Sequence, residues 1–474
     1  MMKFFLPFIT VLTISGCKTV GEQAPVNQNP GLKVVFSDNR AVPDENGLVK
    51  VEVTFLGLPS SSSLIVTRNG GGYGNVNKYG VGILSEKFMF QYAIHPDDPQ
   101  ETVLEFQLMG KDGRPGPVSK LTIDNTSGKK FTTLTFSDFK VVSRVTGKED
   151  NGHDGLPKVA YEVFNNTHTR FDVGGTDLGI TWEISPGKFG MVFGDTFGGD
   201  FVPNLTAPNP GGSNWRGNVL LFSEDTRLSD GLSITGAATD SQGRAREICY
   251  SAHITDGNSD YTSIPTGAVH AGGADYIHYM NIRTWYGWVS NFSSYFKSTD
   301  GARTWNRVRS ISFASRSNFG QVGLFNHEGY VYMIGTVTGR SSNPRLARVV
   351  EDRVEHQDEY EYWSGLGWVR DKETVAAPIF DDFSGELSFA WFPQHRKWVI
   401  LYINEQRNDQ IIMRYADNII GPWSEPQVLT DGRSFWRPYG SFIHPLSLKE
   451  GNDLYFIMSA WNAYNTYLIH GKLN

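Results

Sequence analysis

The segment Trp398-Val399-Ile400-Leu401-Tyr402 contains only β-branched, aliphatic and aromatic residues, and Pro393 and Asn404 mark turns on either side of it. Short apolar runs between turn residues are typical of β-strands. Runs of the same kind recur after Gly128: Val192-Phe193, Val219-Leu220-Leu221-Phe222, Tyr276-Ile277-His278-Tyr279-Met280, Tyr330-Val331-Tyr332-Met333-Ile334 and Leu454-Tyr455-Phe456-Ile457-Met458. No helical period of any length lies between them. The last two-thirds of the chain is therefore predicted to consist of many short strands.

A region with many strands and no helices can fold as a sandwich, a barrel or a radial array of sheets. At four strands and about 65–70 residues per blade, the region has room for five blades. We therefore predict an all-β chain in which residues 129–474 form a five-bladed β-propeller, with six blades as the alternative. Ser298–Trp305 resembles the Asp-box turn of sialidase-type propellers, and Ala416–Ser424 resembles a Gly-Pro-Trp turn of five-bladed glycosidases. Both are interpreted as structural turns.

Residues 31–128 show a different pattern. Leu48–Val53 and Val103–Leu108 alternate between apolar and polar residues, and turn chemistry stands at Asp112-Gly113 and Pro115-Gly116. About six short strands of this kind predict a small immunoglobulin-like β-sandwich that precedes the propeller. A structural spacer is favoured over a glycan-binding module.

The first residues resemble a bacterial lipoprotein signal. Lys3 precedes the apolar stretch Phe4–Ile14, and Ile14-Ser15-Gly16-Cys17 places small residues before a cysteine. The resemblance implies a signal peptide over 1–17 that ends at a lipidated Cys17, followed by a flexible tether over 18–30. Lys18 after that cysteine favours the outer membrane. We therefore expect a cell-envelope lipoprotein that is held to the membrane by its lipid.

Composition excludes several classes of protein. The formal net charge is −7 and Lys and Arg form no blocks, so nucleic acid is not an expected partner. Once Cys17 is lipidated only Cys249 remains, which excludes an internal disulfide and a thiolate zinc site. No catalytic metal or other cofactor is predicted, although the propeller channel leaves room for a structural calcium or sodium ion. We expect a monomer.

The strongest candidates for chemistry are two aspartates beside glycines. Asp177 lies in Gly174-Gly175-Thr176-Asp177-Leu178-Gly179, and Asp195 lies in Phe193-Gly194-Asp195-Thr196-Phe197-Gly198, 18 positions later. A hairpin would bring both to one end of a blade, where they could serve as the two carboxyl groups of a glycosidase. Turn capping is the alternative for each aspartate alone. Glu386, at the head of a strand, is a third candidate, with a solvent-exposed strand edge as its alternative.

Five motifs in order resemble one family: Gly175–Gly179, Phe193–Phe197, Trp215–Asn218, Trp436–Gly440 and Ser459–Tyr464. Together they look like domain-of-unknown-function family 4185, now glycoside hydrolase family 183, over about 131–474. The resemblance implies an endo-D-arabinanase that cleaves α-linked D-arabinofuranose chains of arabinan or arabinogalactan. It also implies that Asp177 and Asp195 stand in the catalytic centre. Retention and inversion of the anomeric centre both remain open.

Aromatic rings and hydroxyl-bonding groups mark the candidate substrate-binding residues. These are Trp215, Arg216, His270, Trp436, Arg437, Tyr439, Trp461, Asn462 and Tyr464. Two alternatives stay open. One is a glycosidase on another furanoside or on sialic acid, the latter requiring Arg216, Arg283 and Arg437 to converge. The other is a non-catalytic glycan-binding surface lipoprotein.

Overall fold

The computed structural model describes residues 27–71, 76–126, 128–148, 165–203, 211–435, 437–449 and 451–474. The predicted signal peptide and Cys17 lie outside these residues, so the lipid anchor and its membrane remain predictions. Within the described part of the chain, no helix is both long and apolar enough to cross a membrane. The chain divides into two compact units. The predicted boundaries at 31, 128 and 129 stay predictions.

Eight strands at the N-terminal end form two sheets. One sheet has the order β1 (Lys33–Phe36), β3 (Leu48–Leu56), β6 (Lys87–Ala93). The other has the order β2 (Arg40–Ala41), β8 (Ser119–Asp124), β7 (Glu101–Gly110), β4 (Ser61–Arg68), β5 (Val76–Gly80). The two sheets pack through alternate apolar side chains, as at Phe36 and Phe106, whose ring centroids are 5.0 Å apart. The predicted sandwich is confirmed.

The remaining strands form five separate antiparallel sheets. In sheet order these are β10 (Gly175–Ser185), β11 (Lys188–Phe197), β12 (Val219–Ser223), β13 (Gly236–Ala237); β14 (Thr262–Ala271), β15 (Ala274–Thr284), β16 (Val289–Ser298), β17 (Asn306–Arg307), with β18 (Phe313–Ala314) also on β16; β19 (Gln321–His327), β20 (Tyr330–Thr336), β21 (Arg345–Val350), β22 (Glu361–Trp363), β23 (Trp368–Arg370); β24 (Gly385–Phe392), β25 (Lys397–Asn404), β26 (Gln410–Ala416), β27 (Gln427–Thr430); and β28 (Pro438–Ile443), β29 (Asp453–Ala460), β30 (Asn465–Leu473), β9 (Phe136–Arg144).

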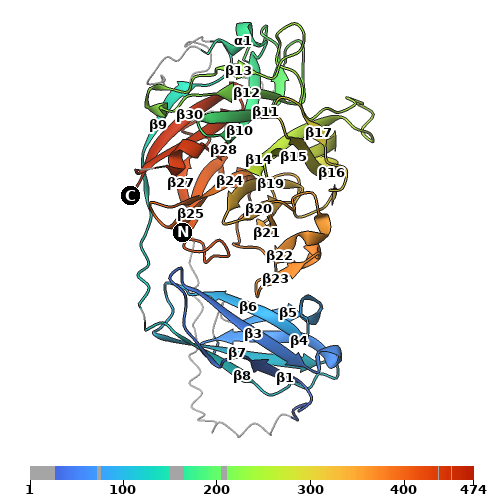
Figure 1. Ribbon diagram of the computed structural model, residues 1–474, viewed down its shortest axis with the longest axis vertical. Helices are drawn as coiled ribbons and strands as arrows, with labels where there is room; N and C mark the ends of the chain where they lie inside the picture. Colours follow the sequence, from blue (N-terminus) through green and yellow to red (C-terminus); the bar gives the residue numbers. More distant parts are fainter. Residues whose placement is uncertain are drawn as a thin grey trace, which may run out of the picture. The chain divides into compact units, whose positions relative to one another are not determined.

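The first strand of each sheet belongs to a closed ring. β10 contacts β14, β14 contacts β19, β19 contacts β24, β24 contacts β28, and β28 contacts β10 again. Figure 1 shows these five strands gathered at the centre, with the other strands of each sheet farther out. The ring closes because β9, from the start of this region, pairs with β30 from its end. The prediction of a five-bladed propeller is confirmed.

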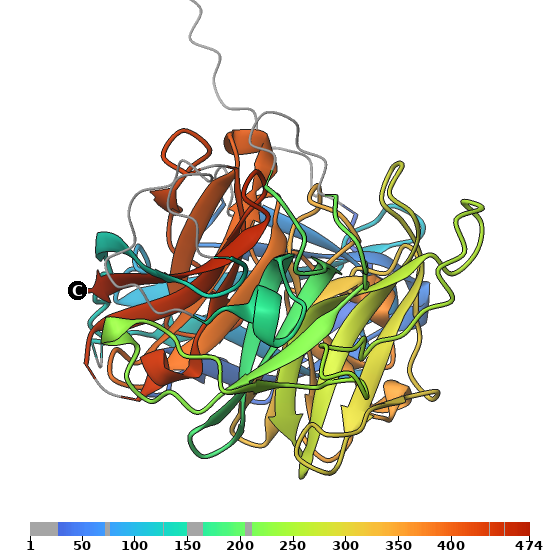
Figure 2. The same ribbon diagram turned by 90° about the horizontal axis from the view of Figure 1, so that it is seen from above.

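Helices are short. Figures 1 and 2 show strands throughout the chain and only brief helical turns. The described part contains one α-helix, α1 (Thr167–Arg170), and seven 3-10 turns: Leu58–Ser60, Val81–Ile83, Leu228–Asp230, Gln357–Glu359, Glu373–Val375, Glu405–Arg407 and Pro445–Leu448.

The apolar runs in the sequence mark one particular strand of each blade. They fall in β11, β15, β20, β25 and β29, the second strands, while Val219–Phe222 falls in the third strand β12. A second strand is covered by neighbouring blades on both faces, and all eight residues of β25 are buried. The residues of such a strand form a continuous apolar run because neither of its faces contacts water.

Both predicted turns are confirmed. Asp300 Oδ1 accepts hydrogen bonds from the backbone N–H groups of Arg303 and Thr304 at 3.1 and 2.9 Å, and Trp305 is buried beside this turn. The Gly-Pro-Trp sequence lies between β26 and β27, where the ring of Trp423 meets that of Phe380 edge-on. Both turns connect the third and fourth strands of their blades and do not line the cavities at the propeller centre.

Candidate active site

The ring of inner strands has a cavity at each end. Residues near the starts of β10, β14, β19, β24 and β28 line a cavity of about 480 Å³, which we call the start cavity. Residues near the ends of the same strands line a second cavity of about 600 Å³, the end cavity. Thr266 and Phe442 line both cavities and therefore lie between them.

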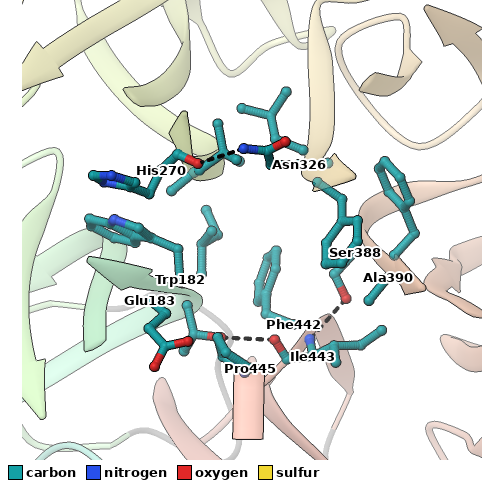
Figure 3. A pocket seen from close by; sticks show the side chains of 18 of the residues that line it. Trp182, Glu183, His270, Asn326, Ser388, Ala390, Phe442, Ile443 and Pro445 are labelled. Atoms are coloured by element: carbon teal, nitrogen blue, oxygen red, sulfur yellow. Dashed lines mark hydrogen bonds between the residues drawn. The ribbon is translucent and has the colours of Figure 1, made fainter. Parts of the chain in front are cut away.

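The end cavity is larger, but several of its polar groups bond to one another (Figure 3). Ser388 Oγ accepts a hydrogen bond from the Ile443 N–H at 2.9 Å, and Asn326 Nδ2 donates to the carbonyl of His270 at 3.3 Å. His270, a predicted substrate-binding residue, lies here with its Nδ1 3.0 Å from Asp275 Oδ1. Among the described residues that line this cavity, none has a buried polar side-chain atom without a partner.

The start cavity brings most of the predicted residues together. It is lined by Asp177, Asp195, Glu386, Trp215, Arg437, Tyr439, Trp461 and Tyr464. Arg216 and Asn462 do not line it, and Trp436 lies outside the described residues. Three cavity residues have buried polar atoms without a partner in the described part of the chain: Asp177 Oδ1, the Trp461 Nε1 and both amide atoms of Gln321. Unpaired buried polar groups destabilise a fold. The start cavity, rather than the end cavity, is therefore the candidate site for a polar ligand.

A bulge in the first hairpin brings the two aspartates together. Thr176 pairs with Thr196 and Leu178 pairs with Phe193, so Asp177 alone faces the two residues Gly194 and Asp195. Leu178 has a φ of 64° within this irregular stretch. Bulges re-aim side chains at the ends of strands, and this one turns Asp177 into the channel mouth.

Gly194 leaves the space that Asp177 occupies. A Cβ atom at residue 194 would overlap Asp177 Oδ1 and lie 3.0 Å from Leu178 Cδ1. We expect Gly194→Ala to displace the Asp177 carboxylate and to slow any reaction that depends on this carboxylate by about a hundredfold. The same overlap should lower the free energy of unfolding by about 1–3 kcal/mol. Gly236→Ala is the matched control in the same blade, because a Cβ there meets only Phe222 Cδ2 at 3.8 Å. Equal activity of both variants would contradict this reading of the bulge.

Asp177 has a high pKa for an aspartate. Burial, reinforced by the charge of Glu386, raises its pKa from 3.8 to about 7. Hydrogen bonds limit the rise, because the hydroxyl groups of Tyr439 and Tyr464 donate to Asp177 Oδ2 at 3.0 and 3.3 Å. Asp177 can therefore ionise near neutral pH.

Asp195 also has a raised pKa. Burial, together with the charges of Asp177 and Glu247, raises its pKa well above 3.8. One group favours its ionised form: the indole N–H of Trp215 donates to Asp195 Oδ1 at 3.0 Å. The ring of Trp215 in turn stacks on Tyr261, with centroids 5.6 Å apart. The two aspartates thus share a site but not an environment.

Glu386 is part of a buried ion pair. Arg340 Nε donates to both of its carboxylate oxygens, at 3.1 and 2.9 Å, and Arg340 Nη2 donates to Oε1 at 2.7 Å. Glu386 is 7% exposed, so the alternative of a solvent-exposed strand edge is wrong. One guanidinium thus engages both oxygens of this carboxylate through charge-assisted hydrogen bonds.

Arg216 turns away from the start cavity. Its Nη1 and Nη2 donate to the backbone carbonyls of Ala245 and Asp172 at 2.8 and 2.6 Å. Arg283 donates from Nε to Asn291 Oδ1 at 2.9 Å and does not line the cavity either. Of the three arginines that a sialic-acid site would require, the structure places only Arg437 at the cavity.

Several cavity residues are not among the predicted site residues. These are Tyr261, Trp285, Trp288, Gln321, Arg340, Glu405 and Asp409. Arg340 joins many of them, since Nη1 lies 3.0 Å from Glu405 Oε1 and its guanidinium lies over the rings of Trp288 and Tyr439 at 5.2 and 5.3 Å. Two tryptophans three positions apart, at 285 and 288, were the one available hint. Within the described residues, no group of three or more His, Cys, Asp or Glu side chains is arranged to hold a metal ion.

A family model described as a domain of unknown function, DUF4185, matches residues 163–470. Notoamide biosynthesis cluster protein J of Aspergillus sp. (strain MF297-2) is 28% identical over 313 residues, which cover 62% of this chain and 81% of that protein. Notoamide biosynthesis cluster protein J' of Aspergillus versicolor is 29% identical over 310 residues, which cover 62% of this chain and 83% of that protein. Among solved structures, the alpha-L-arabinofuranosidase of Podospora anserina in complex with cellotriose matches with a TM-score of 0.40 and 10% identity, covering 72% of this chain and 97% of that one.

Proposed function

This chain belongs to the DUF4185 family, and we propose that it is a glycoside hydrolase whose catalytic carboxyl groups are Asp177 and Asp195. The observation that carries the proposal is the pair itself. Two aspartates with raised pKa values meet at the mouth of the propeller channel, in a cavity walled by tryptophan and tyrosine rings. Glycosidases need one protonated and one ionised carboxyl group on either side of the bond to be cut.

The environments assign the two roles. Asp195, whose pKa is raised by burial and by the charge of Asp177, keeps its proton while Asp177 is ionised and donates it to the leaving glycosidic oxygen. Asp177, which accepts two tyrosine hydrogen bonds, is the carboxylate. It acts on the anomeric carbon either through a water molecule, with inversion, or directly, with retention. The anomeric form of the first product distinguishes these two routes.

We propose α-linked D-arabinofuranose chains, cleaved internally, as the substrate. The ordered motifs from Gly175 to Tyr464 support this choice through their resemblance to endo-D-arabinanases. The cavity supports a neutral sugar: Arg340 is paired with Glu386 and Glu405, and Arg437 lies 3.3 Å from Asp409. With its arginines engaged by carboxylates, the site has little to offer an anionic sugar such as sialic acid.

The pH dependence follows from the two roles. Asp177 must be ionised, so kcat/KM is expected to fall as the pH drops below about 7, the pKa of Asp177. Asp195 must be protonated, so kcat/KM should fall again at a higher pH, where Asp195 loses its proton. Initial rates between pH 4 and 10 test this. An acid limb near pH 4 would show that the burial of Asp177 does not raise its pKa.

A substrate panel tests the proposed function. The purified protein is incubated with D-arabinan, L-arabinan, xylan and a sialylated oligosaccharide, and the products are identified by mass spectrometry. We expect short arabino-oligosaccharides from D-arabinan alone. Product from another polysaccharide would change the sugar but keep the enzyme class. Binding of D-arabinan without any product, at high protein and long incubation, would instead identify a glycan-binding protein.

A further inference from the structure

Gln321 is a buried polar side chain of the start cavity that has no role in the proposed mechanism. It begins the inner strand β19, is 2% exposed and lines the start cavity. Neither its Nε2 nor its Oε1 has a hydrogen-bond partner among the described residues. An amide offers two donors and an acceptor, and a fold leaves all of them unpaired only at a cost.

The backbone next to Gln321 contacts the floor of the cavity. The next residue along the chain, Val322, donates its N–H to Thr266 Oγ1 at 3.2 Å. Thr266 is one of the two residues that separate the start cavity from the end cavity. A sugar ring that reaches Asp177 and Asp195 from the open side would therefore present its far edge to Gln321.

We propose that Gln321 is a specificity-determining residue, which binds a hydroxyl group, or a neighbouring pair of them, on the sugar ring at the cavity floor. The proposal rests on the proposed function, because it needs a neutral sugar in this cavity. A hydroxyl both donates and accepts, so it satisfies the carbonyl and the amine of one amide together. A ring that lacks this hydroxyl, or turns it the other way, leaves the amide buried and unpaired.

The structure supplies a matched control. Thr336 is directly opposite Gln321 in the β19–β20 ladder, is fully buried and also has an unpaired side-chain oxygen, but it does not line the cavity. Gln321→Met and Thr336→Val each replace an unpaired polar group by an apolar one of similar size. The melting temperature of each variant should therefore equal or exceed that of the wild type. We expect a rise of about 1–3 °C where the polar group is fully desolvated.

Only the cavity residue should affect sugar binding. Binding of D-arabinofuranosyl, L-arabinofuranosyl and xylo-oligosaccharides is measured by calorimetry in an Asp195→Asn background, so that no substrate is consumed. For the oligosaccharide that the parent protein binds best, Gln321→Met should weaken binding by about tenfold to a hundredfold. Thr336→Val should leave binding unchanged.

The outcomes separate the two proposals. If the preferred oligosaccharide is not the D-arabinofuranosyl one but Gln321→Met still weakens its binding, the substrate assignment fails and the role of Gln321 stands. If D-arabinofuranosyl chains bind equally well to Gln321→Met, the role of Gln321 fails and the substrate assignment stands. A lower melting temperature of Gln321→Met together with unchanged binding would show that the amide serves only the fold, and it would overturn the proposal. Binding of none of the three probes overturns both.

Discussion

Asparagine in place of Asp195 is expected to slow the hydrolysis of D-arabinan by about 10²–10⁴-fold, because the leaving oxygen then departs without a proton. The loss should depend on the leaving group. An aryl glycoside of an arabino-oligosaccharide, whose phenol leaves as an anion, should be cleaved by Asp195→Asn much faster than D-arabinan is. Asp177→Asn should be slow on both substrates, since its role is at the anomeric carbon. Equal losses on both substrates for Asp195→Asn would reverse the assignment of roles.

The melting temperature of each variant shows whether a lower rate results from lost catalysis or from lost folding. Asp177 has a folded-state pKa of about 7, raised from 3.8, so the fold favours its neutral form. Its contribution to stability is fully present below about pH 4 and is lost as the pH rises through about 7. Asp177→Asn has no charge to bury, so it should melt above the wild type at pH 8. Asp230→Asn, at an exposed carboxylate outside the cavity, is the control and should leave rate and melting temperature unchanged.

Removal of the Arg340 guanidinium should have the largest effect on folding. Arg340→Met leaves the carboxylate of Glu386 buried, and no other hydrogen-bond donor to it is found among the described residues. Breaking a buried pair in this way costs about 3–5 kcal/mol of unfolding free energy. Arg340 also lowers the pKa of Asp177, so the acid limb of the rate profile should move to higher pH. Urea unfolding and the pH profile measure the two effects.

The double variant Arg340→Met/Glu386→Gln tests the cause. It removes both charges, so it should recover most of the stability that Arg340→Met loses. Glu386→Gln alone should be milder, since Arg340 keeps Glu405 as a partner at 3.0 Å. It should also lower the pKa of Asp177, whose value the charge of Glu386 raises. If Arg340→Met is as stable as the wild type, the ion pair does not hold this wall of the cavity together.

The sequence predicted the strands that are buried on both faces. The second strand of each blade is covered on both faces, so its residues form a continuous apolar run that is visible without a structure. Outer strands such as β13 and β17 have only two residues each, too few for any pattern. Asp177 and Asp195 stood out because a bulge and a close approach both require glycine beside them.

The same reasoning failed where neighbours in sequence face opposite ways. Trp215 and Arg216 were predicted together, but an extended backbone sends successive side chains to opposite sides. Trp215 therefore reaches Asp195 while Arg216 reaches the carbonyls of Ala245 and Asp172. Arg340 was missed for another reason. It lies in the connection between β20 and β21 and pairs with Glu386, 46 residues later, and no local pattern records such a distant contact.

The most direct measurement compares the oligosaccharides released from D-arabinan by the wild type and by the double variant Asp177→Asn/Asp195→Asn, at pH 7 and equal concentrations of folded protein. The account predicts that the wild type releases short arabino-oligosaccharides and that the double variant releases none above the uncatalysed background. Release by the double variant at the wild-type rate would show that the two aspartates at the channel mouth are not the catalytic groups.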